Sequence, residues 1–385
     1  MKKVLHLLSG GGAGGIEILC EQIGLRGQYR HEFCFLFSGG VIADRMKEEG
    51  LTTYDLSGES FWNKRRKLLD IFAEGEYSAV VVHHEGVKLY MLYEALIRFA
   101  EKGKMLDVTF IKYLHCTFDD SDFYTGKKVE DWLHHYLLGK TLADSDRLVA
   151  VSEFAGMSYA DEFGLDDDRI QVIYNGIDVS DGESAVTDGK MTRRIEQEQC
   201  TGKEEVQSLD GSRLLYIGRL VKVKGVDVLI KAVALLKKQG NVVTLDILGD
   251  GEARKDFEKL SSDLGVSEQI FFHGVILDKK EYFQRDGIFV YPSVWQEAFG
   301  ISIIEAMSNG LICVASEVGG IPEIITEKEQ GILFEAGNAE ALATAIVEAQ
   351  RRGDAGNYQA YRDEILSRAA EFDIQKSVEQ LEELV

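Results

Sequence analysis

Short apolar segments alternate with amphipathic helical segments along most of this chain, and that alternation limits the possible folds more than any other feature. In the first part of the chain, the apolar segments that predict strands lie at 4–8, 33–37, 79–82, 109–114, 147–151 and 170–174. A second series of such segments lies at 214–217, 243–248, 270–272, 287–291 and 311–315. Strands that alternate with helices form βαβ units and parallel, doubly wound sheets. The sequence therefore predicts two similar α/β domains in series.

Residues 179–212 interrupt this pattern. The segment is polar, contains Gly and Ser, and has almost no apolar periodicity, which is typical of a surface excursion between domains. We therefore predict an N-terminal domain at 1–180, an interdomain connection at 181–212 and a C-terminal domain at 213–355. A chain of 385 residues, 45% of them hydrophobic, is long enough to give each domain its own core.

The charge of the chain excludes some partners. A formal net charge of -22 argues against general nucleic-acid binding, which requires a basic surface. Residues 1–150 carry 19 basic and 22 acidic side chains, whereas the remainder carries 24 and 43. The N-terminal domain is therefore the one that tolerates an anionic surface or substrate.

The apolar segments also bear on location. None approaches the roughly 20 residues that a membrane-spanning helix requires, and Lys2-Lys3 leads into a short strand and glycines instead of a signal peptide. We expect a cytoplasmic protein. The five cysteines are scattered and include no CxxC pair, so we expect reduced, buried thiols.

The stretch 290–323 contains the strongest candidate site. It predicts a buried strand ending at Tyr291, a turn at Pro292, a loop with Glu297, and an apolar helix from near Phe299 that contains Glu305. A carboxylate in that apolar setting costs several kcal/mol if it is buried alone. We therefore expect Glu305 to meet a polar partner or to line a cavity.

A glycine-rich turn follows the first strand. Gly10, Gly12 and Gly15 match GxGxxG, and backbone amides at a helix start can approach a phosphate most closely where glycines leave room. The same fingerprint fits an NAD(P)-dependent oxidoreductase. The acidic residue that would support the oxidoreductase is absent after the strand at 33–37, where Ser38 stands instead.

Cations follow the first strand of the second domain. Arg219 can bind two oxygens of a diphosphate at once, while Lys224 supplies a point charge. A solvated basic loop is the competing interpretation, and it is the one we favour for Lys222.

Seven motifs in order give the chain a family resemblance. They are GGGAGGIE at 10–17, His115, VSEFAGMSYADEFG at 151–164, VIYNGID at 172–178, IGRLVKVKG at 217–225, LGDG at 248–251 and GGIPE at 319–323. The spacing of Glu297 and Glu305, with Phe299-Gly300 between them, is an eighth and separate feature. Together they resemble the retaining glycosyltransferases of family 4, which have the GT-B fold of two Rossmann-like domains facing a central cleft. The resemblance also implies that a C-terminal helix, at about 356–385, crosses back onto the first domain.

The resemblance implies how the donor is bound. Arg219 and Lys224 would hold the diphosphate from the second domain, and Gly14 and Gly15 would approach it from the first. Glu305 would bind the ribose hydroxyls. Fixed cations and helix amides can neutralise the leaving diphosphate, so no metal or other cofactor is expected.

The resemblance likewise implies the residues around the transferred sugar. Glu297 and the segment Phe299-Gly300-Ile301 would hold the donor sugar, and His115 would lie near the sugar and the attacking hydroxyl. Without the resemblance, a His at a strand end is equally well a structural residue. This sequence offers no clear second carboxylate on the acceptor side for double displacement. The family that it resembles is usually discussed as using front-face attack assisted by the leaving phosphate.

Other polar clusters predict no metal site. His83-His84-Glu85 and His134-His135 lack the HExxH spacing. Asp144-Ser145-Asp146 resembles a metal-binding DxD, but it precedes a strand, where a solvated loop is favoured.

Residues 61–72 predict a basic amphipathic helix. Phe61, Leu68, Leu69 and Phe72 would lie on one side, while Lys64, Arg66 and Lys67 spread around the other and Arg65 falls among the apolar residues. Such a helix can lie weakly on an anionic membrane. An ordinary surface helix is the alternative.

The sequence therefore predicts a retaining glycosyltransferase that moves a sugar from a UDP- or GDP-sugar to a saccharide or lipid-linked acceptor. Bacterial surface polysaccharide assembly is the expected process, with contact at the inner face of the membrane through 61–72. The alternatives are the oxidoreductase and a non-catalytic nucleotide-sugar-binding protein.

Overall fold

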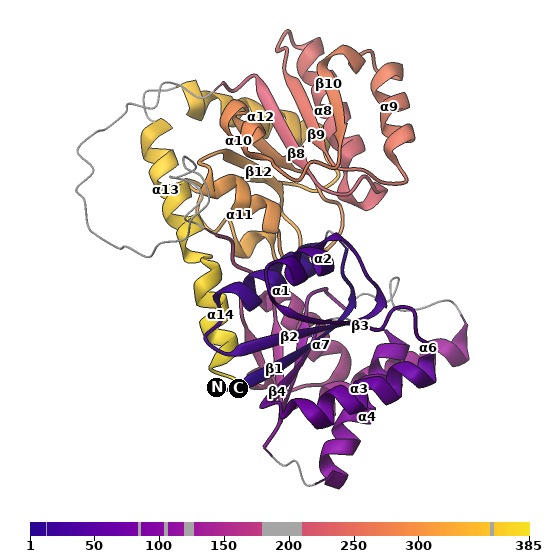
Figure 1. Cartoon of the computed structure of the whole chain (residues 1–385). Helices are drawn as coiled ribbons and strands as arrows, with labels where there is room; N and C mark the ends of the chain where they lie inside the picture. The colour runs from indigo at the N-terminus through magenta and orange to yellow at the C-terminus, as the bar shows by residue number, and fades with distance from the viewer. Residues whose placement is uncertain (13, 84–85, 104–106, 119–126, 179–209, 355–357) are drawn as a thin grey trace, which may run out of the picture. The chain divides into compact units, whose positions relative to one another are not determined.

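The computed structural model describes residues 1–12, 14–83, 86–103, 107–118, 127–178, 210–354 and 358–385, which form two compact units (Figure 1). The first unit contains 1–177, 296–301 and 372–385, and the second contains 178–295 and 302–371. The chain thus returns to the first unit at residue 372, within the helical region predicted to cross back from about 356. Most of the predicted connection, residues 181–209, lies outside the described residues.

The first unit contains a seven-stranded parallel sheet in the order β3-β2-β1-β4-β5-β6-β7. Its strands are β1 (Lys3–Gly10), β2 (Arg30–Ser38), β3 (Thr52–Asp55), β4 (Ala79–Val82), β5 (Thr109–Leu114), β6 (Arg147–Ala150) and β7 (Ile170–Val172). Its helices are α1 (Gly15–Arg26), α2 (Val41–Glu48), α3 (Phe61–Gly75), α4 (Val87–Gly103), α6 (Lys128–Asp144), α7 (Glu153–Phe163), the 3-10 turn η1 (Asp167–Arg169) and α14 (Ile374–Glu382).

The second unit contains a six-stranded parallel sheet in the order β10-β9-β8-β11-β12-β13. Its strands are β8 (Arg213–Ile217), β9 (Thr244–Leu248), β10 (Ile270–Gly274), β11 (Ile288–Tyr291), β12 (Ile312–Ser316) and β13 (Ile332–Phe334). Its helices are α8 (Val226–Lys238), α9 (Arg254–Asp263), α10 (Lys280–Arg285), α11 (Ile301–Ser308), α12 (Ala339–Asp354) and α13 (Tyr358–Glu371), with 3-10 turns η3 (Lys222–Lys224), η4 (Ser267–Gln269) and η5 (Ile321–Glu323).

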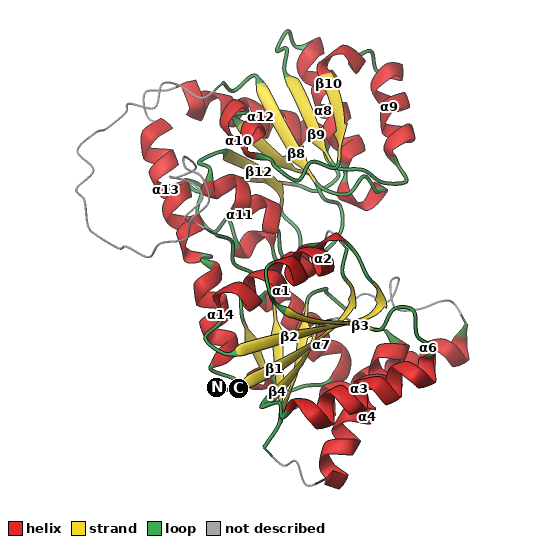
Figure 2. Cartoon of the chain, in the orientation of Figure 1, coloured by secondary structure: helices red, strands yellow, loops and turns green. Residues whose placement is uncertain are grey.

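Each sheet is doubly wound, as the alternation predicted. The strand order reverses between β1 and β4 in the first unit and between β8 and β11 in the second. Ligands of open α/β sheets bind outside the carboxyl ends of the strands at such a reversal. The turns after β1 and β8, which lie at these reversals, are therefore the candidate ligand-binding positions. Helices cover the sheets (Figure 2).

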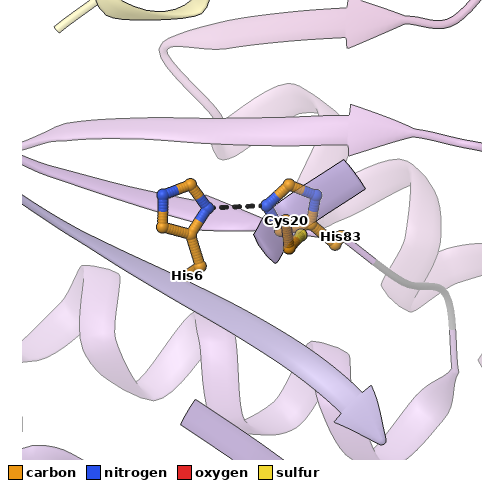
Figure 3. Close-up of side chains that lie close together, drawn as sticks. All are labelled: His6, Cys20 and His83. Carbon is orange, nitrogen blue, oxygen red and sulfur yellow. Dashed lines mark hydrogen bonds between the residues drawn. The ribbon is translucent and has the colours of Figure 1, made fainter. Parts of the chain in front are cut away.

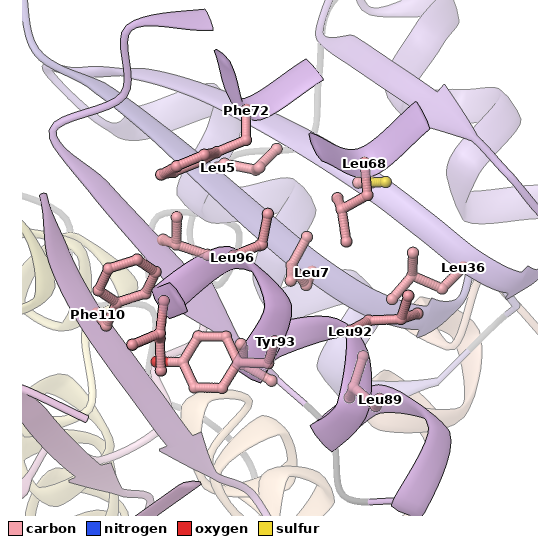
Figure 4. Close-up of a cluster of buried hydrophobic side chains, with 14 of the residues drawn as sticks. Leu5, Leu7, Leu36, Leu68, Phe72, Leu89, Leu92, Tyr93, Leu96 and Phe110 are labelled. Carbon is pink, nitrogen blue, oxygen red and sulfur yellow. The ribbon is translucent and has the colours of Figure 1, made fainter. Parts of the chain in front are cut away.

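The alternation of side chains along β1 separates two environments. Leu5 and Leu7 belong to the core beneath α3 and α4, together with Leu68, Phe72 and Leu92 (Figure 4). Successive side chains of a strand point to opposite faces. His6 is therefore on the other face, the one that holds the cluster of Leu8, Cys20, Phe33, Phe35, Ile42, Ala43 and Met46.

Two details of the helix at 61–72 differ from the prediction. Lys64 is buried, and its Nζ donates hydrogen bonds to the carbonyls of Leu56 and Ser57 at 2.5 and 2.9 Å. The Lys64 ammonium therefore supplies the hydrogen bonds that these two backbone carbonyls need. It does not contribute to a basic surface on the helix. Arg65, in contrast, is exposed and does not lie among the apolar residues.

Other differences are small. Helix α11 begins at Ile301 rather than at Phe299, and the sequence reasoning missed the short edge strands β3 and β13. Cys20, Cys34 and Cys313 are free and buried as expected, but Cys116 is exposed. In the part of the chain that the structure describes, no helix is long and apolar enough to cross a membrane.

Candidate active site

The turns after β8 and β11 are locked together at the carboxyl edge of the second sheet. Gly225 has a φ of 67°, and a Cβ at this position would lie 1.9 Å from the carbonyl oxygen of Pro292. The amide of Val294 donates to the carbonyl of Val223 at 2.9 Å. Only glycine fits the left-handed conformation and the close approach. This contact fixes the loop that carries the predicted diphosphate ligands.

Arg219 and Lys224 occupy different settings in that loop. The Arg219 side chain is exposed, and its backbone carbonyl accepts a hydrogen bond from the Tyr216 hydroxyl at 3.1 Å. Lys224 is half-buried, with its Nζ 3.5 Å from the Tyr291 hydroxyl and 5.8 Å from the centre of that ring. Lys222 is exposed. Lys224 is therefore held at the reversal point, whereas the Arg219 guanidinium faces solvent.

Glu305 has the polar partner that its apolar helix requires. It lies on α11, and its carboxylate accepts a hydrogen bond from the Lys279 ammonium at 2.6 Å. The side chains of Glu305 and Lys279 are 29% and 24% exposed, respectively, so the ion pair remains accessible to solvent. An incoming ligand can reach this carboxylate without breaking into the core.

The loop that carries Glu297 is anchored within the first unit. Thr117, just beyond β5, donates to the carbonyl of Gln296 at 3.2 Å, and Ser152, the N-cap of α7, donates to the carbonyl of Ala298. Glu297 lies between these anchors and is buried. Two independent elements thus fix the backbone on either side of its carboxylate.

Phe299 is a packing residue of the same unit. Its ring lies 5.8 Å from that of Tyr174 and 5.7 Å from that of Phe372, measured between centroids. Gly300 is buried and Ile301 is half-buried at the start of α11. The backbone at 299–301 is therefore held by aromatic packing, and any contact with a sugar would come from its amides and carbonyls.

The glycine-rich turn divides into two parts. Gly11 donates to the carbonyl of Ser38, and a Cβ at Gly11 would lie 2.5 Å from that of Ala43, so this glycine permits close packing on α2. Gly14 is the N-cap of α1, and Gly15 begins the helix, where a Cβ would lie 3.2 Å from Ile301 Cδ1. The start of α1 and the segment 299–301 are therefore neighbours.

Four imidazoles lie in a row across the first sheet. His31 is on β2, His6 is on β1, His83 directly follows β4 and His115 directly follows β5, which are neighbouring strands. The nitrogen to nitrogen distances along the row are 2.8, 2.8 and 3.0 Å. Oε1 of Glu382, on α14, lies 3.0 Å from Nε2 of His31 at the far end.

The rings of this row differ in exposure and charge. His6 and His83 are completely buried, and burial holds the pKa of each well below its usual value because the protonated ring would lose its hydration. Desolvation also lowers the pKa of His31, although Glu382 opposes that effect. His115 is half-buried and stacks on Tyr113 with centroids 4.3 Å apart. The buried rings are therefore neutral near pH 7.

His6, His83 and Cys20 form the one group of metal-ligand types found among the described residues (Figure 3). His6 Nδ1 and His83 Nε2 are 2.8 Å apart, a hydrogen-bond distance, whereas two nitrogens on a tetrahedral zinc lie about 3.3 Å apart, given bonds of about 2.0 Å. Burial raises the pKa of the Cys20 thiol well above its usual value, which keeps it protonated. This group is better suited to hydrogen bonding than to holding a metal.

Comparison with protein families decides the broad class. The model of "Glycosyltransferase Family 4" matches residues 31–181, and that of "Glycosyl transferases group 1" matches residues 203–361. The chain belongs to the family 4, group 1 glycosyltransferases. It is therefore an enzyme of the glycosyltransferase class, and the oxidoreductase alternative is excluded.

Individual relatives agree with this assignment. An uncharacterized glycosyltransferase of Methanocaldococcus jannaschii is 30% identical over 53% of this chain and 50% of its own length. The lipopolysaccharide core biosynthesis glycosyltransferase LpsE of Rhizobium meliloti is 34% identical over 38% of this chain and 44% of its own length. The chain thus spans half or less of the length of these two relatives.

Solved structures establish the fold of this glycosyltransferase as GT-B. The structure of Anabaena HepE in complex with UDP-glucose covers 100% of this chain and 99% of its own, with a TM-score of 0.78 and 18% sequence identity. At that identity the similarity concerns the fold alone. The prediction of two Rossmann-like domains with the GT-B fold is confirmed.

Sequence reasoning about this glycosyltransferase missed several polar residues near the candidate site. Lys279, the partner of Glu305, stands outside every motif. His6, His31 and Glu382 also went unnoticed, although His6 and His31 fall in strands that the doubly wound order makes neighbours. A search for polar residues inside predicted buried strands would have found His6, whereas His31 lies before the predicted strand at 33–37 and within the longer observed β2.

Proposed function

We propose that this enzyme transfers a sugar, with retention of anomeric configuration, from a nucleoside diphosphate sugar to a saccharide or lipid-linked saccharide. The observation that carries the proposal is the loop after β8, where Arg219 and Lys224 lie at the strand-order reversal of the second sheet. A leaving diphosphate gains charge as its bond to the sugar breaks, and fixed cations at that edge stabilise it.

The remaining predicted roles follow the same chemistry. Glu305 accepts hydrogen bonds from the ribose hydroxyls of the donor, and its ion pair with Lys279 keeps the carboxylate in place before the donor arrives. Glu297 and the backbone at 299–301 bind the donor sugar, and His115 accepts a hydrogen bond from the sugar. The amides at Gly14 and Gly15 approach the diphosphate.

The relatives suggest the substrates to test first. HepE was solved with UDP-glucose, so we propose a UDP-sugar as donor, with GDP-sugars as the second choice. LpsE is named for lipopolysaccharide core biosynthesis, which supports a role in surface polysaccharide assembly for this enzyme too.

A donor screen tests the proposal. We expect one class of nucleotide sugar to raise the melting temperature of the protein by mass action and to be slowly hydrolysed by it. Both effects should occur with EDTA present, because Arg219 and Lys224 take the place of a metal ion at the diphosphate. Turnover that is lost in EDTA and restored by Mn²⁺ would contradict the metal-free mechanism. Stabilisation without any turnover, with or without metal, would favour the non-catalytic binding protein.

The two glutamates are expected to respond differently to substitution. Glu305→Ala should weaken binding of donor and free nucleotide by roughly 1.5–3 kcal/mol, the value of charge-assisted hydrogen bonds. Glu297→Ala should lower kcat more than it lowers nucleotide affinity. Calorimetric titration with UDP and steady-state kinetics measure both quantities. Glu327→Ala, at an exposed glutamate of the second unit, is the control. Unchanged nucleotide affinity in Glu305→Ala would refute the assignment to ribose.

We further propose that the acceptor is lipid-linked and that α3 and α6 face the membrane. Trp62 is 72% exposed near the start of α3, beside the exposed cations Arg65 and Arg66. Val129 and Trp132 near the start of α6 are 79% and 65% exposed. Aromatic and cationic side chains together favour the interface of an anionic bilayer. Lys67 contributes less, because it pairs with Glu59 at 2.6 Å.

Vesicle binding tests this membrane contact. We expect salt-sensitive co-sedimentation with phosphatidylserine-containing vesicles, and at least a 10-fold loss when Trp62, Arg65 and Arg66 are all changed to Ser, since each cation contributes about 1 kcal/mol. Activity on a water-soluble acceptor should persist. Changing the exposed Lys255 and Lys259 of α9 to Ser is the control. If the unaltered protein fails to bind at low salt, the membrane proposal is wrong.

A further inference from the structure

The row of imidazoles ends on a carboxylate, and that end sets its direction. Oε1 of Glu382 lies 2.8 Å from the backbone amide of Tyr29 and 3.0 Å from Nε2 of His31. A backbone amide can only donate, so this oxygen is held as an acceptor. The carboxylate therefore accepts from His31 as well, which places the His31 proton on Nε2 and leaves its Nδ1 as an acceptor.

The same logic passes from ring to ring. A neutral imidazole has one N–H donor and one acceptor nitrogen. Because His31 Nδ1 accepts, His6 must donate from Nε2 and accept at Nδ1. His83 then donates from Nε2 to His6 and accepts at its own Nδ1. The last bond is donated by Nε2 of His115 to Nδ1 of His83.

We propose that Glu382, His31, His6 and His83 form a directional hydrogen-bond chain that fixes His115 in its Nε2–H tautomer, with Nδ1 as the acceptor nitrogen. The four are positioning residues, since they act through His115. The use of that acceptor toward a hydroxyl of the bound sugar rests on the function proposed above, whereas the tautomer itself does not.

The burial of the chain supports this role. His6 and His83 are completely buried, and Glu382 is only 7% exposed. Neutral rings are less costly to bury than charged ones, and burial lowers the pKa of both histidines, so a head-to-tail series without a positive charge is the stable arrangement. Phe33 stacks on His6 with centroids 4.9 Å apart, which restricts rotation of the central ring.

The experiment measures the His115 tautomer directly. Long-range ¹H–¹⁵N correlation spectra of the free, uniformly ¹⁵N-labelled protein distinguish Nε2–H from Nδ1–H, and His115→Gln assigns the signals. We expect a single Nε2–H form of His115 at neutral pH. A His115 that carries its proton on Nδ1, or protonated His6 and His83 at neutral pH, would overturn the proposal.

Variants at Glu382 test the direction of the chain. Glu382→Met removes the acceptor, so His115 should become a mixture of tautomers and kcat should fall by at least about 10-fold, as expected when a histidine loses the group that fixes its tautomer. Glu382→Gln keeps an oxygen for Tyr29 and His31, so it should restore the single tautomer and most of kcat. Glu383→Met, at the exposed neighbouring residue, is the control. A Glu382→Met protein whose His115 spectrum is unchanged would refute the direction.

Two further results separate the competing explanations. His6→Phe interrupts the chain in the middle, so it should mix the His115 tautomers while Glu382 is intact; an unchanged tautomer would contradict the proposal. Retention of one equivalent of zinc through dialysis, lost in Cys20→Ala, would also overturn it, because His6 and His83 would then be metal ligands. If the tautomers behave as expected but His115→Ala retains full turnover, the chain stands and only the catalytic role of His115 fails.

Discussion

Arg219→Ala is expected to lower kcat/KM for the donor by about 10²–10³, because a preorganised group that stabilises developing charge contributes on this scale. The guanidinium is exposed and its own loop is held by the Gly225 to Pro292 contact, so the substitution removes charge without disturbing the fold. Lys224→Ala should have a similar effect. Initial rates of donor hydrolysis and of transfer, at several donor concentrations, measure both.

Lys222→Ala is the matched control for these cations. Lys222 is exposed and belongs to the same 3-10 turn as Lys224. Lys222→Ala therefore removes the same charge from the loop as Lys224→Ala or Arg219→Ala does. We expect less than about a threefold change in kcat/KM, since an exposed charge is screened by solvent. If all three substitutions act alike, the loop exerts only a general field and the specific diphosphate contacts are wrong.

Gly225→Ala is expected to destabilise the second unit by about 2–5 kcal/mol. A left-handed backbone costs an L-residue about 1–2 kcal/mol, and relief of the overlap with the Pro292 carbonyl costs about 1–3 kcal/mol more. Trp295 is the tryptophan of the second unit, so Trp62→Phe and Trp132→Phe together leave a fluorescence signal for that unit alone. Urea unfolding followed at Trp295 then reports the change.

Gly240→Ala separates the two costs. Gly240 also has a positive φ, 82°, but a Cβ there would meet nothing within 4 Å. It should lose only the 1–2 kcal/mol of backbone strain. If Gly225→Ala and Gly240→Ala lower the free energy of unfolding equally, the turn at Pro292 moves aside without cost. The fixed geometry inferred for the diphosphate loop would then be incorrect.

Most of the fold was predictable because its strands are buried on both faces. Such strands form continuous apolar runs, as in 79–82 and 311–315, and they stand out against amphipathic helices. The missed strands β3 and β13 lie at sheet edges and are only four and three residues long. Edge strands need little apolar character, because one side of each has no strand partner.

The candidate site was predictable only in part. Motif spacing singled out Arg219 and Lys224, which lie in the turn after β8, and Glu305, which lies on α11. Their roles toward the donor are proposals. Lys64 was misplaced because helical periodicity predicts the face of a side chain but not whether nearby carbonyls bind its ammonium. The contact of Glu382 with His31 joins residues 351 positions apart, which no local pattern records.

Helix α14 has a consequence for how the protein is made. Residues 372–385 belong to the first unit, and Ile177 forms a β-bridge with Asp373 there. Ribosomes add about 5–20 residues per second, so the 194 residues at 178–371, which supply only 296–301 to the first unit, delay its C-terminal part by roughly 10–40 s. During that interval the nascent first unit lacks the carboxylate of Glu382 and the ring of Phe372.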